Sequence, residues 1–276
     1  MKLSFLLPAV FLCGCASFGT FAGQDTTEVT FGADAEENMR KGNDAFESKN
    51  YQEAASYFEF VKTKYPYLEL ARTAELRLGD SDFEREKYAE ARDRYQNFVR
   101  LHPTHARIDY AAFRAALTHY KEIPSDFFLL PPASEKDQVE VRNALSSMND
   151  FVRMYPGSEH IKDAKKVMDE VKLRLAEHEL YVADFYSNPL RAKWPAVIAR
   201  LEGVVKNYSG IGLDEKIAFD LSDAYVKNND PAGARRALER YAKAFPNEDG
   251  AKKALARAAE LPAVNPAPAA KPDAGT

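Results

Sequence analysis

The apolar positions of this chain recur at helical spacing, and the whole set then repeats. In 34–66, small and apolar residues stand mostly three to four positions apart, which places them on one face of an α-helix. The first set comprises Gly42, Phe46, Tyr51, Ala54, Phe58, Val61 and Pro66, and thirty-seven residues later the same positions hold Gly79, Phe83, Tyr88, Ala91, Tyr95, Phe98 and Pro103. Seven matched positions predict two copies of one unit, a pair of helices that ends at a proline.

The residue types at these positions suit two helices that pack closely. Gly42 and Gly79 are small enough for the first helix of each pair, helix A, to approach the second, helix B. Ala54 and Ala91 allow the same approach from helix B. We expect the tyrosine after the turn to pack across it, and the final proline to end helix B.

Three more units continue the pattern less regularly. The third has Ala116, Tyr120, Ala144, Met148, Phe151 and Pro156, with a connection from Lys121 to Val141 that is far longer than standard. The fourth has Val182, Tyr186, Trp194, Val197, Leu201 and Val204 and ends at Tyr208 and Ser209 in place of a residue followed by proline. The fifth has Ser222, Val226, Pro231, Ala234, Leu238, Tyr241 and Pro246, with a turn at Asn229 and Asp230 and helix B starting at Pro231. The chain is therefore predicted to form an all-α superhelical solenoid of five tetratricopeptide-like helical hairpins over 34–261.

The two ends of the chain carry other signals. Residues 1–14 have the charge and apolar run of an export signal, too short to span a bilayer, and the run closes with a lipobox before Cys15. We expect Cys15 to be lipidated and to become the first mature residue, anchored in lipid by several acyl chains, palmitate among them. Residues 15–33 are predicted to be a flexible tether. Nine of the fifteen residues in 262–276 are Pro or Ala, which predicts a disordered tail.

Composition narrows the class of protein. Of the 276 residues, 29% are charged, and the formal net charge of −4 becomes −5 once Lys2 leaves with the signal. Basic and acidic residues are mixed throughout, so no nucleic-acid partner is expected. Cys13 leaves and Cys15 carries lipid, so no thiol is left for a disulfide, a metal site or a nucleophile.

Two segments resemble the BamD family, the lipoprotein subunit of the outer-membrane β-barrel assembly machine. One is 98–117, with Arg100, Leu101, His102, Pro103, Thr104, His105, Ile108, Asp109 and Tyr110; the other is 175–208, with Leu175, Ala176, Glu179, Val182, Ala183, Tyr186, Trp194, Val197, Arg200, Glu202, Gly203 and Tyr208. The likeness covers about residues 12 to 260, including the lipobox and the long third insertion. Ser209 and the Pro/Ala tail depart from the family pattern.

The resemblance implies a function and partners. It implies a lipoprotein on the periplasmic face of the outer membrane, sorted there because Ala16 stands where a retention signal has Asp. It also implies docking on the POTRA domains of a BamA-like barrel protein, contact with other assembly lipoproteins, and delivery of unfolded outer-membrane proteins. Arg200 and Glu202 match the family residue by residue and are our candidates for the barrel partner; the alternative is a solvated ion pair on helix B. A pilotin that assists a secretin is the alternative function, and an enzyme comes third.

Two further surfaces are candidates for binding. Helix A faces line the groove of a tetratricopeptide stack, which commonly binds peptides. The groove-facing register picks out Met39, Asn43, Phe46, Asp80 and Phe83, of which the two phenylalanines also fit the core. The long connection contains Phe127, Phe128, Leu129 and Leu130, which either pack back on the third hairpin, the reading we favour, or bind a partner.

No catalytic residue, metal site or cofactor is predicted. The five histidines form no H-E-x-x-H motif, and His102 and His105 flank a helix-ending proline, which favours a role in the turn. The acidic run Asp80, Asp82, Glu84 and Glu86 is expected to be a solvated face rather than an acid/base pair. Gly210 and Gly212 belong to a loop rather than a dinucleotide fingerprint, and Trp194 is expected to pack in the core rather than stack on a ligand.

Overall fold

The computed structural model describes residues 29–124, 137–190 and 192–262. This part of the chain is all helical. The helices are α1 (Ala35–Glu47), α2 (Tyr51–Lys64), α3 (Glu69–Glu84), α4 (Tyr88–Leu101), α5 (Ile108–Glu122), α6 (Val139–Met154), α7 (Ile161–Ser187), α8 (Trp194–Asn207), α9 (Asp214–Lys227), α10 (Pro231–Ala244) and α11 (Asp249–Glu260). The prediction of an all-α solenoid is confirmed.

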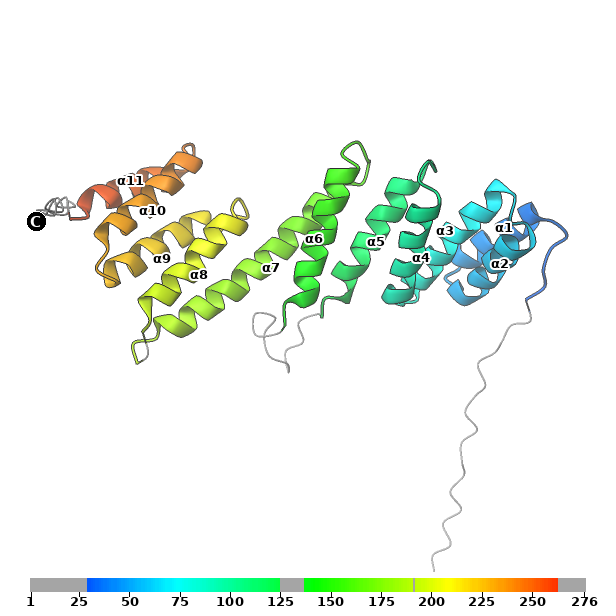
Figure 1. Cartoon of the computed structure of the whole chain (residues 1–276), viewed down its shortest axis with the longest axis horizontal. Helices are drawn as coiled ribbons and strands as arrows, with labels where there is room; N and C mark the ends of the chain where they lie inside the picture. The colour runs from blue at the N-terminus through cyan, green and yellow to red at the C-terminus, as the bar shows by residue number, and fades with distance from the viewer. Residues whose placement is uncertain (1–28, 125–136, 191, 263–276) are drawn as a thin grey trace, which may run out of the picture.

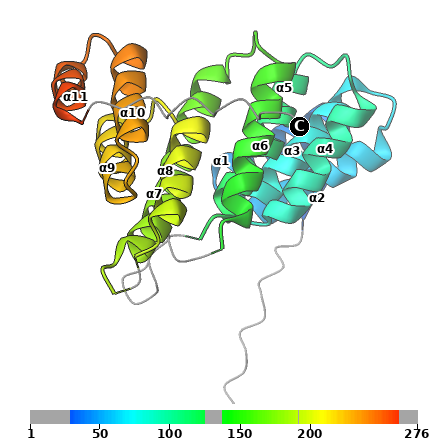
Figure 2. The same ribbon diagram turned by 60° about the vertical axis from the view of Figure 1, so that its left-hand side comes forward.

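The helices form a row in which each one packs against the next in sequence (Figure 1). Five hairpins result, α1–α2 to α9–α10, and the turned view shows them stacked along one long axis (Figure 2). A last helix, α11, was not recognised separately in the sequence. Its buried Ala251, Ala254 and Ala258 pack on α10, and they cover the end of the fifth hairpin.

Close approach within the first two hairpins depends on glycine, as predicted. A Cβ at Gly42 would lie 2.6 Å from Cε1 of Phe58, and one at Gly79 would lie 2.8 Å from Cε1 of Tyr95. Both rings are fully buried between helix A and helix B. An aromatic ring of helix B therefore lies directly on the backbone of helix A, where any larger residue would overlap with it.

The turns and helix ends also repeat. Tyr51 and Tyr88 each begin a helix B and pack edge-on against the phenylalanine across the turn, with ring centroids 5.1 and 5.3 Å apart. Four helices B end at a residue that precedes proline, and all four share nearly the same backbone angles, φ about −126° and ψ between 51° and 57°; they are Tyr65, His102, Tyr155 and Phe245. Proline excludes the helical conformation from the residue before it. Tyr208, which precedes Ser209, keeps a ψ of 29° instead.

The third and fourth hairpins share one long helix. α7 has 27 residues, whereas the other helices have 12 to 16. Its first half packs on α5 and α6, and its second half forms a hairpin with α8. Ile123, at the start of the long connection, packs beside the buried Val141 and Val171. Phe127, Phe128, Leu129 and Leu130 lie outside the described residues, as do Cys15 and the tail, so both alternatives for the connection stay open.

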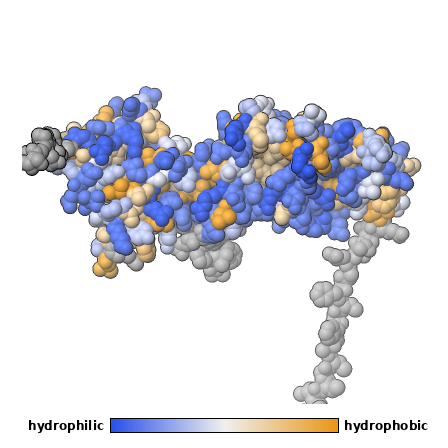
Figure 3. Space-filling view, in the orientation of Figure 1, coloured by the Kyte–Doolittle hydropathy of each residue, from blue (hydrophilic) through white to orange (hydrophobic). Residues whose placement is uncertain are grey.

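The surface is mainly hydrophilic on the face shown in Figure 3, with small separate hydrophobic patches. Among the described helices, none combines the length and the apolar character that crossing a bilayer requires.

Replacing Gly42 by Ala tests the close approach, and Gly203→Ala on α8 is its matched control. Alanine favours a helix over glycine by about 1 kcal/mol, but at position 42 the new methyl group overlaps with the Phe58 ring. We expect Gly42→Ala to lower the free energy of unfolding by about 1 to 2 kcal/mol. A Cβ at Gly203 meets nothing within 4 Å, so that variant should gain roughly 0.5–1 kcal/mol. Urea unfolding followed by circular dichroism measures both, and equal effects would contradict the packing role of Gly42.

Candidate functional site

The predicted groove residues lie at two depths. Met39, Asp80 and Phe83 are buried, with 5%, 1% and 6% of their surface exposed. Asn43 and Phe46 are half-buried. Another molecule could touch the last two directly, whereas the first three lie beneath other side chains.

An arginine of the second hairpin covers a phenylalanine of the first hairpin. The Arg77 guanidinium lies over the ring of Phe46, 4.0 Å from its centroid. Its Nε donates to Oδ1 of Asn43 at 3.1 Å, and its Nη1 donates to Oδ2 of Asp80 at 3.3 Å. The ring and both acceptors position a charged group whose own side chain is 20% exposed.

The contact between an arginine and a phenylalanine ring recurs one repeat further on, with different polar partners. The Arg114 guanidinium of α5 lies 3.7 Å from the ring centroid of Phe83, and its Nη2 donates to Oε1 of Glu84 at 3.2 Å. Arg40, Arg77 and Arg114 follow each other at intervals of thirty-seven residues. Our sequence reasoning missed these arginines, although the repeat register alone would have aligned them. We call the surface formed by Asn43, Phe46, Arg77, Glu84 and Arg114 the N-terminal groove.

A buried carboxylate supports this groove from below. Oδ1 of Asp80 accepts hydrogen bonds from the hydroxyl groups of Tyr95, at 2.7 Å, and Tyr110, at 2.8 Å. These side chains belong to three successive helices, α3, α4 and α5. The carboxylate therefore joins the second hairpin to the third, and its burial is compensated by several donors.

The prediction of a solvated acidic face is wrong for Asp80 and Asp82. Asp82 is 6% exposed, and its Oδ2 accepts from Nε of Arg94 at 2.6 Å. Only Glu84 and Glu86 of the run are exposed. Residues two apart point to different sides of a helix, and α3 is covered on several sides by α1, α2 and α4.

The surroundings of Asp80 also change the acidity of its partners. Burial, and next the neighbouring Asp80 carboxylate, raise the pKa of Tyr95 far above its usual value. The same two causes raise the pKa of Tyr110. Both hydroxyl groups therefore stay protonated and act as donors at every physiological pH.

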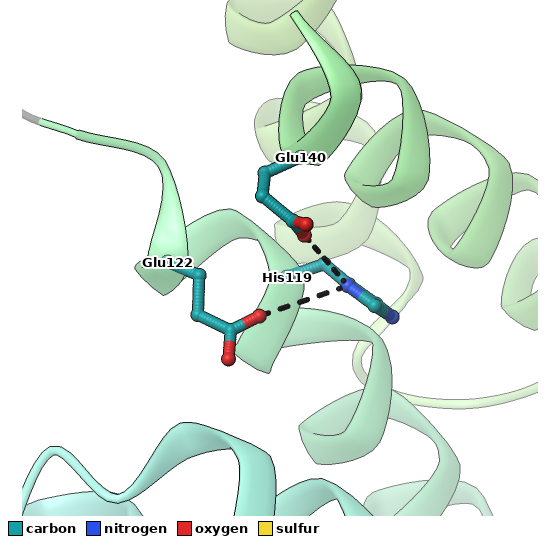
Figure 4. Close-up of side chains that lie close together, drawn as sticks. All are labelled: His119, Glu122 and Glu140. Carbon is teal, nitrogen blue, oxygen red and sulfur yellow. Dashed lines mark hydrogen bonds and ion pairs between the residues drawn. The ribbon is translucent and has the colours of Figure 1, made fainter. Parts of the chain in front are cut away.

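One group of side chains in the described part has the atoms to hold a metal ion: His119, Glu122 and Glu140 (Figure 4). Nδ1 of His119 lies 3.2 Å from Oε2 of Glu140 and 3.9 Å from Oε2 of Glu122. However, Nη1 of Arg92 lies 2.6 Å from the same Glu122 oxygen and 3.2 Å from Nδ1 of His119. A guanidinium thus already supplies the positive charge at these atoms, and the group acts as an ion-pair cluster that joins α4, α5 and α6 at the base of the long connection.

His102 and His105 lie in the turn, as predicted. Both rings contact Phe98, with centroids 4.9 Å apart. Each also pairs with a carboxylate of α3, His102 with Glu75 at 2.9 Å and His105 with Glu69 at 3.1 Å.

Arg200 and Glu202 lie on α8 but do not pair with each other. Nη1 of Arg200 lies 2.9 Å from Oε2 of Glu179 on α7. Glu202 accepts from the Tyr225 hydroxyl and from Nη1 of Arg240, both at 2.9 Å. The side chains of Arg200 and Glu202 remain 44% and 32% exposed. They are held by neighbouring helices and are still within reach of another protein.

Trp194 begins α8, at the position that Tyr51 and Tyr88 hold in α2 and α4. It packs against the buried cluster of the fourth and fifth hairpins, in agreement with the core interpretation. The ring is not fully covered, and the ammonium group of Lys227 lies 4.6 Å from its centroid.

Fold and site together define a helical-repeat protein whose exposed functional groups suit binding to other proteins. The family described as outer membrane lipoprotein, YfiO, matches residues 33–216, and a tetratricopeptide repeat matches residues 219–261. The chain belongs to this outer membrane lipoprotein family, which is the BamD family.

Relatives in several bacteria are named outer membrane protein assembly factor BamD. The Vibrio cholerae protein is 26% identical over 96% of this chain and 98% of its own length, and that of Rickettsia prowazekii is 29% identical over 82% and 85%. The match with the Caulobacter vibrioides protein, at 27% identity, spans 67% of this chain and 57% of that protein. Among solved structures, the TPR2AB domain of yeast Sti1 in complex with pHSP90 is similar over 81% of this chain and 82% of its own, with a TM-score of 0.43 and 13% identity.

Replacing Tyr95 by Phe tests the buried carboxylate. The pKa values of Tyr95 and Tyr110 are raised in the folded state, so their protonated hydroxyl groups stabilise the fold fully at pH values below the unfolded pKa. This contribution is lost as the pH rises from about 10 through the folded pKa. We expect Tyr95→Phe to lower the free energy of unfolding by about 1–3 kcal/mol at neutral pH, since a hydrogen bond to a buried charge is lost. The decline of stability above about pH 10 should also become shallower. Urea unfolding across this pH range measures both effects.

The matched control is Tyr67→Phe, because that side chain is 97% exposed. It should change neither the stability nor the pH profile. If Tyr95→Phe behaves like Tyr67→Phe, the hydrogen bond between Tyr95 and Asp80 contributes nothing to the stability of the fold.

Proposed function

We propose that this protein is a lipid-anchored scaffold subunit of the machinery that assembles β-barrel proteins in the outer membrane. The observation that supports it most is the family match over 33–216, which covers four hairpins and the start of the fifth. A relative similar over 96% of this chain is named an outer membrane protein assembly factor. A row of hairpins with exposed charged surfaces suits the binding of several proteins at once.

We propose that Cys15 anchors the chain in the inner leaflet of the outer membrane. The support is the lipobox that ends at this residue and the description of the family as outer membrane lipoproteins. Residues 15–33 would then connect the acyl chains to the first hairpin on the periplasmic face. Several acyl chains hold a protein at a membrane almost permanently.

The barrel partner would bind the C-terminal hairpins. In this proposal, Arg200 and Glu202 contact the POTRA domains of a BamA-like protein. Their support is the residue-by-residue resemblance, and also their exposure on α8 while they stay held by Glu179 and Arg240. Charged groups that are already ordered lose little conformational entropy on binding.

Clients would bind the N-terminal groove. Unfolded outer-membrane proteins would contact Asn43 and Phe46 directly, together with the partly exposed donors of Arg77 and Arg114. Met39, Asp80 and Phe83 would act from below, by holding this surface in place. Extended peptides commonly bind such grooves through backbone hydrogen bonds and side-chain pockets. Other assembly lipoproteins would use the remaining surface.

Reversing the charge of Arg200 tests the docking surface. Arg200→Glu should weaken co-purification of the barrel protein roughly tenfold after gentle detergent extraction, because a charge at the interface becomes repulsive. Helicity should not change, since the residue is 44% exposed. The matched control is Arg153→Glu on α6, whose side chain is 77% exposed and also pairs with one carboxylate.

A second variant separates docking from local structure. Adding Glu179→Arg to Arg200→Glu restores an internal ion pair with reversed polarity. If this double variant recovers the barrel protein, Arg200 acts only within the protein. Recovery of a secretin in place of a barrel protein with POTRA domains would favour the pilotin alternative instead.

Replacing Cys15 by Ala tests the anchor. The variant should move from the outer-membrane fraction to the soluble periplasmic fraction, since the acyl chains supply most of the membrane affinity. Fractionation should be done in cells depleted of the barrel partner, which would otherwise retain the protein. A variant that still fractionates entirely with outer membranes would contradict the assignment of Cys15.

A further inference from the structure

A cleft lies in the C-terminal half of the solenoid, away from the N-terminal groove residues. It opens between α7, α8 and α9 and has a volume of about 290 Å³. Leu180 and the Trp194 ring line its apolar part, and Asp184, Asp220 and Asp223 line its polar part. We call it the C-terminal cleft. Its volume is near the lower end of the roughly 300–1,000 Å³ of small-ligand pockets, enough for a few side chains of a peptide.

The charges around the cleft are only partly compensated. Asp220 pairs with Lys216 of the same helix, and Asp223 pairs with Nη2 of Arg257 on α11 at 3.5 Å. Within the described residues, Asp184 forms no ion pair and is exposed. Lys216 and Lys227 also line the cleft, so its charges are mixed. An apolar segment with one basic residue could contact the Trp194 ring and pair with the Asp184 carboxylate.

The chain itself leaves the solenoid beside this cleft. Arg257, which pairs with the cleft residue Asp223, lies only four residues before Leu261. The Leu261 carbonyl accepts from Nη2 of Arg235 at 2.7 Å, which holds the end of α11 against α10. α9, α10 and α11 lie together at this end of the molecule (Figure 2). Pro262 lies five residues beyond Arg257, so the residues that follow it start on the side of the molecule where Arg257 reaches the cleft residue Asp223.

We propose that residues 263–276 bind in the C-terminal cleft of the same molecule. Pro266, Pro268 and Pro272 favour the polyproline II conformation, which has no internal hydrogen bonds and binds to aromatic-lined grooves. Prolines of the segment contact Trp194, and Lys271, its one basic residue, pairs with Asp184. The ammonium group of Lys227, beside the Trp194 ring, donates to free carbonyl groups of the segment.

The segment is long enough for this arrangement. Fourteen residues span about 43 Å as polyproline II, and Lys271 can lie up to about 28 Å from Pro262. Asp220 is three residues from Asp223 on α9, or about 4.5 Å along the helix. The cleft is therefore well within reach, and the segment can turn into it without being fully extended.

A partner segment could enter the C-terminal cleft only by displacing residues 263–276, whose effective concentration there is on the order of millimolar. This proposal does not depend on the proposed function, because it concerns two parts of one chain.

Trp194 is the only tryptophan of the chain and reports directly on the cleft. The experiment measures acrylamide quenching of its fluorescence in the purified full-length protein and in a variant that stops after Pro262. We expect quenching to be about twofold stronger without the segment, because the ring loses its cover. All described helices end before this point, and circular dichroism with thermal melting checks that the shortened protein folds normally.

A synthetic peptide of residues 262–276, added to the shortened protein, should restore the protection. Its dissociation constant should lie below about 1 mM. The tethered segment has an effective concentration on the order of 1 mM, so a weaker site would be mostly empty in the full-length protein. In the full-length protein, Lys271→Glu should increase quenching, and in the peptide it should weaken binding about two- to fivefold. Asp273→Asn is the matched control and should change neither.

Three results would overturn the proposal. The first is equal quenching with and without residues 263–276. The second is a peptide that does not bind at millimolar concentration. The third is protection in the full-length protein that disappears on dilution, which would show that the cleft takes the segment of a second copy.

Discussion

The structure depends on the contact between one helical hairpin and the next. A single hairpin leaves one side of its helices uncovered, so its core is complete only when a neighbour packs on it. Within a hairpin, Gly42 and Gly79 let an aromatic ring rest on the backbone of helix A. Between hairpins, an arginine lies on the phenylalanine of the preceding unit, as Arg77 does on Phe46. These contacts recur at the same interval as the sequence repeat, which is why the stack is regular in its first half.

The two halves of the solenoid use polar groups differently. In the N-terminal half, the buried carboxylate of Asp80 accepts from two tyrosine hydroxyls and an arginine, so the polar network holds the hairpins in one relative position. In the C-terminal half, the ion pairs of Arg200 and Glu202 are partly exposed. A surface held by hydrogen bonds and an accessible charged face suit the two binding tasks that we propose, because a surface that is ordered beforehand binds at a lower cost in conformational entropy.

The long helix α7 marks the boundary between these halves. Its first half packs on the third hairpin and its second half forms the fourth hairpin with α8, so one continuous helix joins the two hairpins. The ion-pair cluster of Arg92, His119, Glu122 and Glu140 lies before this boundary, between α4, α5 and α6, and joins residues at both ends of the long connection. The C-terminal cleft opens beyond it, where α7 meets α8 and α9.

The sequence by itself determined the fold class, the number of hairpins and the positions of their turns, because helical periodicity, glycine and proline act over a few residues. It also placed Trp194 at the start of a helix B. Only the tertiary structure decided which polar residues are buried. Asp80 and Asp82 belong to a run that looks solvated, yet the stacking of neighbouring helices encloses both. Such burial depends on residues far apart in the chain, such as Tyr110, whose position relative to Asp80 follows from how the second and third hairpins pack.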